Sequence, residues 1–220
     1  MQRRQFLRNA AALPALAALA GADQLPEPIA LPKPQTQGGK PLMQALAERK
    51  TTREIGEERL SPQTLSNLLW AAFGVNRPGG YRTAPSAMNV KEMDIYVFLP
   101  EGVYLFDAAA HGLRPVIAGD HRAESGTQAN VGKAGVSLVY VADLDKYGAR
   151  IGDAATRTAW SNAHAGFIAQ NVYLFAASEG LASWFRAFVD HAALTKLLSL
   201  RPAQKVMYGQ GVGYPAKKSL

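Results

Sequence analysis

The sequence predicts an α+β fold, in which helices pack on a mostly antiparallel or mixed β-sheet. Three stretches indicate this class. Residues 94–106 contain two strand-like runs joined by a Pro-Glu-Gly turn, which is typical of a hairpin. Residues 136–142 form a continuous apolar, β-rich run, as expected for a central strand. Residues 160–179 form the longest helical pattern, and Gly180 ends it.

Residues 1–22 have the three-part layout of a secretory signal. A basic start precedes an apolar run and then Ala20-Gly21-Ala22, so we expect cleavage after Ala22. The apolar run is too short to span a bilayer. Arg3-Arg4-Gln5-Phe6-Leu7 resembles the twin-arginine consensus, with an ordinary Sec signal as the alternative. The sequence therefore predicts a periplasmic protein exported by the twin-arginine translocase.

The next stretch connects this signal to a single domain. Residues 23–40 are rich in Pro, Gln and Gly and predict an extended, mobile linker. Pro41 begins the first helical pattern, in which Leu42, Ala45 and Leu46 share one face. One domain is expected over residues 41–220, because the sequence shows no internal repeat and no sign of a second domain.

Further elements follow in order along the domain. Ser61 is a helix N-cap followed by Pro62 in the first turn, and Gly74 ends that helix. Asp190 caps a later helix that runs to Leu200, and residues 205–213 form the last strand. The helix over residues 160–179 is apolar nearly all round, so it needs cover inside the protein or from a second subunit.

Composition narrows the functional classes. The net charge is +7, and part of it lies in the basic start of the signal. The mild positive balance that remains, with no dense Lys/Arg run, excludes nucleic acid as a partner and suits an anionic ligand. The chain has no cysteine, which excludes disulfides, thiolate chemistry and Cys-ligated metal. No metal site is expected, because Asp120, His121 and Glu124 fit an exposed polar turn.

A glycine-rich stretch near the end of the chain looks superficially like a dinucleotide-binding loop. Residues 209–213 read Gly-Gln-Gly-Val-Gly, but they lie in or just after the last strand. No helix follows that could offer its N-terminus to a pyrophosphate, so a Rossmann site is excluded.

Three separated clusters suit one anionic ligand. In the first, Arg49, Thr51 and Arg53 would point the same way from an extended chain and could hold a phosphate, the alternative being a solvated basic turn. The second is the polar loop 82–89. The third, residues 182–188, contains aromatic residues that suit a plain core and Arg186, which needs an anionic or carbonyl partner if it is buried.

In this order, the clusters resemble the FMN-dependent nitroreductase family over residues 41–218. The branch that includes the azoline (thiazole/oxazole) dehydrogenases is the most similar. Six stretches carry the resemblance: Arg49–Arg53, Ser61–Gly74, Arg82–Asn89, Gly102–Asp107, His164–Leu181 and Gly211–Pro215. The resemblance implies a nitroreductase-like fold with FMN at a homodimer interface.

The resemblance also implies where the cofactor is bound. Arg49, Lys50 and Thr51 match a triplet that grips the FMN phosphate and ribityl chain, and Arg53 matches the frequent second arginine of that motif. Pro85-Ser86 match a loop that reaches the flavin of the other subunit. Asn89 sits where many relatives have Asn, although Val90-Lys91-Glu92 here replace the usual Gln-Pro-Trp.

The remaining implied contacts lie in the second half of the chain. His164 falls where relatives place a polar contact to the cofactor. The segment that faces the flavin N5 and O4 is matched by Trp184, Phe185, Arg186, Ala187 and Phe188. Lys218 follows the Gly-Tyr-Pro turn, where a basic residue completes the phosphate site.

We therefore expect an exported FMN oxidoreductase that passes hydride to or from a small-molecule substrate through flavin N5. Such chemistry requires no acid–base side chain, and we assign no catalytic residue. FMN is made in the cytoplasm, which agrees with export of an already folded protein. The expected electron source is a substrate being oxidised, or a periplasmic or membrane redox partner, rather than NAD(P)H. The alternatives are a non-catalytic flavin- or nucleotide-binding periplasmic protein and a structural periplasmic domain.

Overall fold

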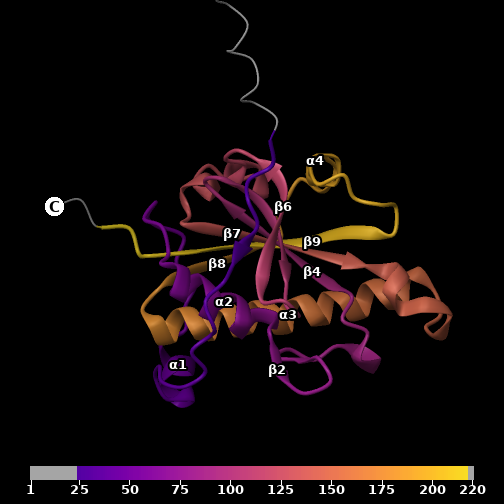
Figure 1. Cartoon of the computed structure of the whole chain (residues 1–220), viewed down its shortest axis with the longest axis horizontal. Coiled ribbons are helices and arrows are strands. Elements are labelled where there is room, and N and C mark those ends of the chain that lie inside the picture. Colours follow the sequence, from indigo (N-terminus) through magenta and orange to yellow (C-terminus); the bar gives the residue numbers. More distant parts are fainter. Residues whose placement is uncertain (1–23, 218–220) are drawn as a thin grey trace, which may run out of the picture.

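A computed structural model describes residues 24–217 of the chain, so the expected signal and Lys218 lie outside the described residues. Its main feature is one seven-stranded sheet in the order β1-β6-β5-β4-β7-β9-β8, antiparallel throughout (Figure 1). The strands are β1 (Ile29–Ala30), β4 (Met93–Leu99), β5 (Gly102–Asp107), β6 (Gly112–Ala118), β7 (Val136–Asp143), β8 (Ala182–Arg186) and β9 (Gln204–Gly213). A small hairpin of β2 (Val75–Arg77) and β3 (Tyr81–Arg82) stands apart.

Helices cover both faces of the sheet, as Figure 1 shows. The α-helices are α1 (Leu42–Glu48), α2 (Pro62–Phe73), α3 (Ala154–Glu179) and α4 (His191–Leu197). Short 3₁₀ turns are η1 (Ala87–Asn89), η2 (Arg122–Ser125), η3 (Val131–Lys133) and η4 (Leu144–Arg150). Within residues 24–217, no helix combines the length and apolarity needed to cross a bilayer. The expected α+β class is confirmed.

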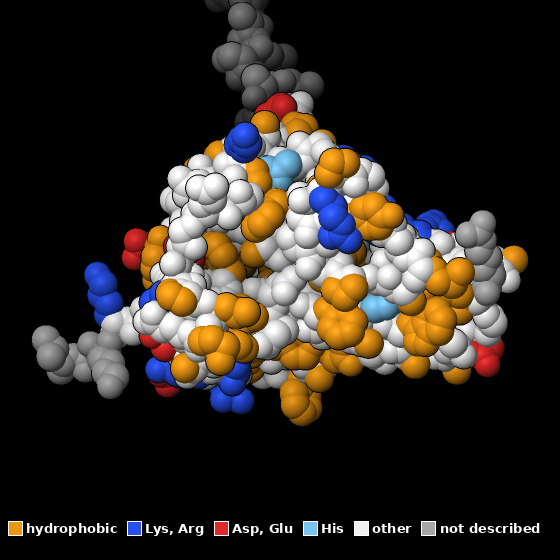
Figure 2. All heavy atoms as spheres, turned by 90° about the horizontal axis from the view of Figure 1, so that it is seen from below, with side chains coloured by type: hydrophobic (Ala, Val, Ile, Leu, Met, Phe, Trp, Pro, Cys, Tyr) orange, Lys and Arg blue, Asp and Glu red, His pale blue; other side chains and the backbone are white. Residues whose placement is uncertain are grey.

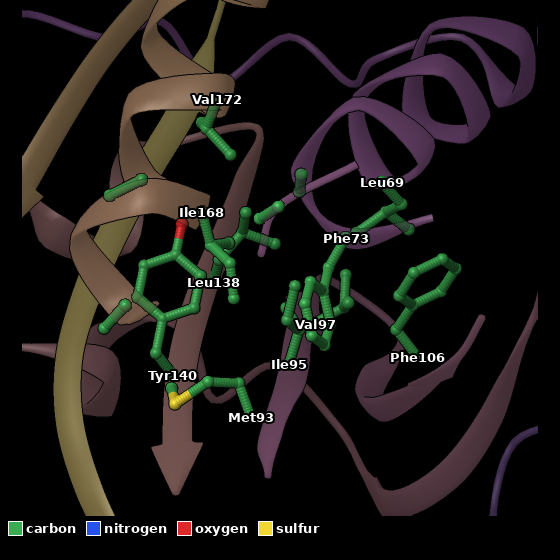
Figure 3. Close-up of a cluster of buried hydrophobic side chains, with 14 of the residues drawn as sticks. Leu69, Phe73, Met93, Ile95, Val97, Phe106, Leu138, Tyr140, Ile168 and Val172 are labelled. Atoms are coloured by element: carbon green, nitrogen blue, oxygen red, sulfur yellow. The ribbon is translucent and has the colours of Figure 1, made fainter. Parts of the chain in front are cut away.

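The central strands are buried on both faces, which explains why their sequences are continuously apolar. In β4, Ile95 and Val97 pack with α2 and α3, whereas Tyr96 and Phe98 pack on the other side with α4. Figure 3 shows the larger core, where side chains of β4, β7, α2 and α3 meet. This two-sided core makes the sheet a rigid base for the residues at its edges.

The predicted helix ends are confirmed where capping residues mark them. Ser61 accepts a hydrogen bond from the Thr64 amide, Asp190 caps α4, and Gly180 ends α3 in the left-handed conformation with φ 68°. Two bounds differ from the expectation. Helix α3 begins at Ala154, where Asp153 caps it, and not at residue 160, so it is more than one and a half turns longer than expected. Helix α4 ends at Leu197, three residues before Leu200.

The face expected for α1 is not a core face. Of its apolar residues only Ala45 is buried, whereas Leu42 is 63% exposed and Leu46 is 44% exposed. Likewise α3 buries one side on the sheet and leaves Trp160 and Phe167 exposed on the other. Both helices therefore present apolar side chains that no other part of residues 24–217 covers.

The segment before α1 differs from the mobile linker that we expected. Residues 29–30 pair with β6 at the edge of the sheet. The hydroxyl of buried Ser66 donates to the Pro32 carbonyl oxygen, and the Lys40 amide donates to Ser178 Oγ across 2.8 Å. The segment is extended, as its Pro-rich composition indicates, but tertiary hydrogen bonds hold it against the domain.

Candidate functional site

The arginine cluster lies along the open edge of β8. Strand β8 pairs with β9 on one side only, and the Thr52 amide donates to the Ser183 carbonyl oxygen on the other side across 2.9 Å. Residues 49–53 are therefore extended beside the strand. In an extended chain every second side chain points the same way, which is the basis of the prediction for Arg49, Thr51 and Arg53.

The side chains of Arg49 and Thr51 both reach Tyr173, whereas Arg53 packs on Trp184, which points to the other face of the sheet. The Arg49 guanidinium lies 5.3 Å from the centre of the Tyr173 ring, and Thr51 Oγ1 lies 2.9 Å from the Tyr173 hydroxyl. The Arg53 guanidinium lies 5.7 Å from the centre of the Trp184 ring. Two cations and a hydroxyl are thus held against aromatic rings beside β8, a geometry that suits a phosphate group.

Tyr173 joins this loop to the strand. Its hydroxyl accepts a hydrogen bond from the Phe185 amide across 2.9 Å, while it shares a second hydrogen bond with Thr51. Beyond β8, the exposed residues Ala187 and Phe188 continue the edge. We call this set the β8 edge site; its members are Arg49, Thr51, Arg53, Tyr173, Trp184, Phe185, Arg186, Ala187 and Phe188.

Arg186 is the charged residue buried at this site. The residue is 2% exposed, and its Nε and Nη1 have no partner within residues 24–217. Burial lowers the pKa of Arg186 to about 10. Side chains at Gly209 and Gly211 would come within 3.2 Å and 3.0 Å of its guanidinium, so these glycines of β9 leave room for a cation. Its Nη2 donates to the Ser125 carbonyl oxygen across 3.4 Å, which supplies the expected carbonyl partner, and Nε and Nη1 can still donate to an anion.

Lys50 lines a cavity of about 670 Å³ beside the β8 edge site. Thr52, Glu54 and Tyr173 line the same cavity, so Lys50 and the β8 edge site share Tyr173. The expected contact of Lys50 with the FMN phosphate stays a prediction. None of the ion pairs among residues 24–217 involves Arg49, Lys50 or Arg53.

The polar loop that carries Pro85, Ser86 and Asn89 is not part of this site within one chain. It contacts α3 at His164, nine residues before Tyr173, which is about 14 Å along a helix. Pro85 and Asn89 are exposed, so both are available to another molecule. This separation agrees with the implied role of the loop, which is to reach the flavin of a second subunit.

The expected contact of His164 with the cofactor is not supported. The ring is 5% exposed, and both nitrogens are used inside the chain. The Ala87 amide donates to Nε2 across 2.9 Å, and Nδ1 lies 2.6 Å from Glu92 Oε1. Because both nitrogens are occupied, His164 holds the polar loop and leaves no ring nitrogen for a ligand.

Two residues of functional interest were not found from the sequence. Tyr173 sits within a long apolar helix, and no local pattern marks its hydroxyl. Glu92 is fully buried at the start of β4, and it stands where relatives of the resembled family have the Trp of Gln-Pro-Trp. That departure was a signal, although its partner His164 lies 72 residues away in the sequence.

Comparisons with known proteins agree with this architecture. A 2.00 Å crystal structure of a "putative nitroreductase" from Ralstonia eutropha JMP134 superposes with a TM-score of 0.82 and 37% identity, covering 92% of this chain and 98% of that one. A "putative nitroreductase" of Methanocaldococcus jannaschii is 30% identical over 152 residues, 64% of this chain and 76% of that protein.

A more distant likeness concerns the fold alone. The Escherichia coli microcin synthetase McbBCD complex contains a chain with a TM-score of 0.62 and 21% identity, covering 77% of this chain and 71% of that one.

The family model described as "Nitroreductase family" matches residues 46–214, a range that includes the whole β8 edge site. On this evidence the chain belongs to the nitroreductase family.

Proposed function

We propose that this protein is an exported FMN-dependent oxidoreductase that works as a homodimer and transfers hydride between flavin N5 and a small-molecule substrate. Membership of the nitroreductase family supports oxidoreductase activity. The observation that carries the cofactor assignment is the β8 edge site, where two arginines, a threonine and the open edge of a strand lie together.

The residues at the site fit FMN chemically. Arg49 and Arg53 are cations outside every ion pair of residues 24–217, so they are free to hold a phosphate by charge-assisted hydrogen bonds. Ala187 and Phe188 extend the edge beyond the hydrogen bonds that β8 makes with Thr52 and Tyr173, and Phe188 offers exposed aromatic surface for a planar ring. Arg186 adds a buried positive charge with two unsatisfied nitrogens.

Each part of the chain has a separate task in this proposal. Arg49 and Arg53 bind the phosphate, and Thr51 and Tyr173 orient the segment that carries them. The charge of Arg186 stabilises negative charge that develops nearby on reduction. When bound, FMN supplies the hydride acceptor and donor at N5, so no proton-transferring side chain is required of the protein.

An apolar surface supports the homodimer. Among residues 24–217, seven of the nine exposed large hydrophobic residues lie on α1, β3, η1 or α3: Leu42, Met43, Leu46, Tyr81, Met88, Trp160 and Phe167. These elements run along the lower side of the molecule in Figure 1. Figure 2, viewed from that side, shows hydrophobic side chains spread over the face. Surfaces of this kind mark protein–protein contacts, and a second copy would also bring Pro85, Ser86 and Asn89 to the flavin of its partner.

The closing test of this proposal is spectroscopic. Purified protein is expected to be yellow, to release FMN on denaturation, and to bleach with dithionite. Reoxidation of the reduced protein by a quinone or a nitroaromatic compound distinguishes an oxidoreductase from a non-catalytic flavin-binding protein. A colourless protein that cannot be reconstituted with FMN contradicts the cofactor assignment.

Export and the electron source belong to the same proposal and need their own tests. Replacing the pair Arg3 and Arg4 by lysine should keep the protein in the cytoplasm if the twin-arginine pathway is used, whereas a Sec substrate would still be exported. In anaerobic stopped-flow experiments, we expect candidate substrates to bleach the flavin. Reduction by NADH or NADPH at tens per second, with micromolar affinity, contradicts this expectation.

A further inference from the structure

The polar loop 82–89 and the two residues that follow it have an unusual backbone, and residues 85–91 are called the loop from here on. Met88, Asn89 and Lys91 all have positive φ values, of 53°, 55° and 56°. Non-glycine residues rarely adopt this conformation because Cβ then crowds the backbone. Three such residues in four positions require an outside constraint that keeps the loop in place.

Packing and hydrogen bonds supply that constraint. Val90 packs against the core, and Lys91 Nζ lies 6.0 Å from the centre of the Tyr81 ring. Inside the loop, the Lys91 amide donates to Ser86 Oγ and the Asn89 amide donates to the Ser86 carbonyl oxygen. Among the hydrogen bonds of residues 24–217, the bond from the Ala87 amide to His164 Nε2 is the one that joins residues 85–91 to another element. The hydrogen-bonded anchor of the loop therefore depends on the acceptor at His164 Nε2.

Glu92 determines whether His164 can accept that hydrogen bond. A backbone amide can only donate, so Nε2 must carry the lone pair and Nδ1 must carry the proton. That proton points to Glu92 Oε1, 2.6 Å away, in a site where Glu92 is 0% and His164 is 5% exposed. A carboxylate beside Nδ1 selects this tautomer, since the other tautomer would set a lone pair against a negative charge.

The placement of Glu92 is costly unless it serves such a purpose. Its second oxygen, Oε2, is buried and has no hydrogen-bond partner among the described residues. Buried carboxylates are destabilising when they are incompletely paired. The residue also belongs to the stretch Val90-Lys91-Glu92 that departs from the family pattern, so this chain carries the pair in place of a more usual segment.

We propose that Glu92 and His164 are positioning residues, and that Glu92 holds His164 in the tautomer that anchors the strained loop through the Ala87 amide. The loop then presents Met88 and Asn89 outward, and Met88 is 61% exposed. The effect on flavin binding rests on the proposed function, in which this loop completes the FMN site of a second subunit. The anchoring itself does not depend on a flavin.

The first experiment measures the tautomer of His164 and the protection of the Ala87 amide in the whole protein. A long-range proton–nitrogen NMR spectrum should show His164 protonated at Nδ1 and not at Nε2. In Glu92→Gln, the amide can donate to Nδ1 as well as accept from it, so the tautomer is no longer selected. Hydrogen exchange at the Ala87 amide should then accelerate at least tenfold, whereas amides of the central strands β4 and β7 should keep their protection.

A variant without an imidazole at position 164 distinguishes tautomer selection by Glu92 from a simple packing role of Glu92. In His164→Gln, the side-chain oxygen can accept from Ala87 without any tautomer to select. Adding Glu92→Gln to that background should change Ala87 exchange less than twofold. An equal acceleration in both backgrounds, or a wild-type His164 protonated at Nε2, overturns the proposal. Ser66→Ala is the control, because it removes a buried side-chain hydrogen bond on α2, from Ser66 Oγ to the Pro32 carbonyl oxygen, and should leave Ala87 protected.

FMN titration of the same variants distinguishes the two proposals. If the loop completes the cofactor site, Glu92→Gln should weaken FMN binding three- to tenfold along with the loss of Ala87 protection. If Ala87 protection falls while FMN affinity is unchanged, the anchor stands and the assignment of this loop to the flavin is wrong.

Discussion

Tyr173 of α3 and Phe185 of β8 meet at one hydrogen bond, in which the Phe185 amide donates to the Tyr173 hydroxyl across 2.9 Å. The same hydroxyl lies 2.9 Å from Thr51 Oγ1. One phenol therefore ties together a helix, the open edge of the sheet and the arginine segment. The relative position of Arg49 and the β8 edge depends on this atom.

Replacing Tyr173 with phenylalanine tests that relationship. The ring beneath Arg49 remains, but the Phe185 amide and Thr51 lose their common partner. We expect the free energy of unfolding to fall by about 0.5–1.5 kcal/mol, the usual contribution of a neutral hydrogen bond. FMN affinity, measured by fluorescence titration, should fall by more than that of Tyr208→Phe, which removes an exposed hydroxyl bonded to Asn162. Equal affinities in the two variants contradict the role of Tyr173.

Arg49→Ala tests the phosphate grip. The variant should weaken FMN binding by about 1.5–3 kcal/mol, the range for hydrogen bonds to charged groups. Riboflavin lacks the phosphate, so its affinity should hardly change. Arg114→Ala is the matched control, because Arg114 is an exposed arginine on β6, several strands away from the β8 edge site. If Arg49→Ala weakens both ligands equally, Arg49 acts on folding and not on the phosphate.

The sequence predicts the scaffold better than the site. The central strands and the capped helices follow from local patterns, namely two-sided burial in β4 and β7 and side-chain caps at Ser61 and Asp190. Strand β6 is harder to predict because Pro115 interrupts it. The strand tolerates Pro115 because the β5–β6 pairing is irregular there, so the missing amide breaks no regular ladder.

At the site, the periodicity of a segment predicts only the relative directions of side chains within that segment. The common direction of Arg49 and Thr51, which both reach Tyr173, follows from the extended chain. The position of Tyr173 and the use of both nitrogens of His164 follow from contacts distant in sequence, which a periodic pattern cannot contain. The same reason explains why residues 24–40 appear linker-like, since their anchors lie on other elements.

Phe167→Asp tests the homodimer. Phe167 is 46% exposed on the outer side of α3, and a second subunit would cover it. Burying an unpaired carboxylate there should weaken the dimer by about 3 kcal/mol, or roughly a hundredfold in the dissociation constant. Analytical ultracentrifugation should show a monomer at micromolar concentration. Leu25→Asp changes an equally apolar, 55% exposed residue away from this face and should leave the dimer intact.

The cap formed by Asp153 should make the free energy of unfolding decrease at acid pH. It caps α3 by accepting a hydrogen bond from the Thr156 amide across 2.7 Å, and that bond lowers the pKa of the Asp153 carboxyl. A carboxyl whose pKa is lower in the folded state contributes stability above its unfolded pKa of about 3.9, and this contribution is lost as the pH falls through the folded pKa. Urea denaturation should therefore show wild-type stability approaching that of Asp153→Ala from about pH 5 downward.

A second variant at this cap isolates the charge. Asp153→Asn retains an oxygen that can accept from Thr156 but cannot titrate. Its stability should fall less on acidification than that of the wild type. An identical pH dependence in Asp153→Asn and the wild type would assign the acid sensitivity to other carboxyl groups.

The docking of residues 24–40 has a consequence for how the chain avoids self-association. Strand β1 occupies the outer edge of β6, and the arginine segment lies along the opposite edge at β8. Exposed strand edges are templates on which further chains can add strands and build fibrils. Ile29 pairs with Leu113, which lies far along the chain. Pairing of β1 with β6 therefore requires a long loop to close, which is slow compared with local contacts. During folding, the outer edge of β6 is therefore unpaired until residues 29–30 bind to it. Pairing with this segment then prevents other chains from adding a strand there.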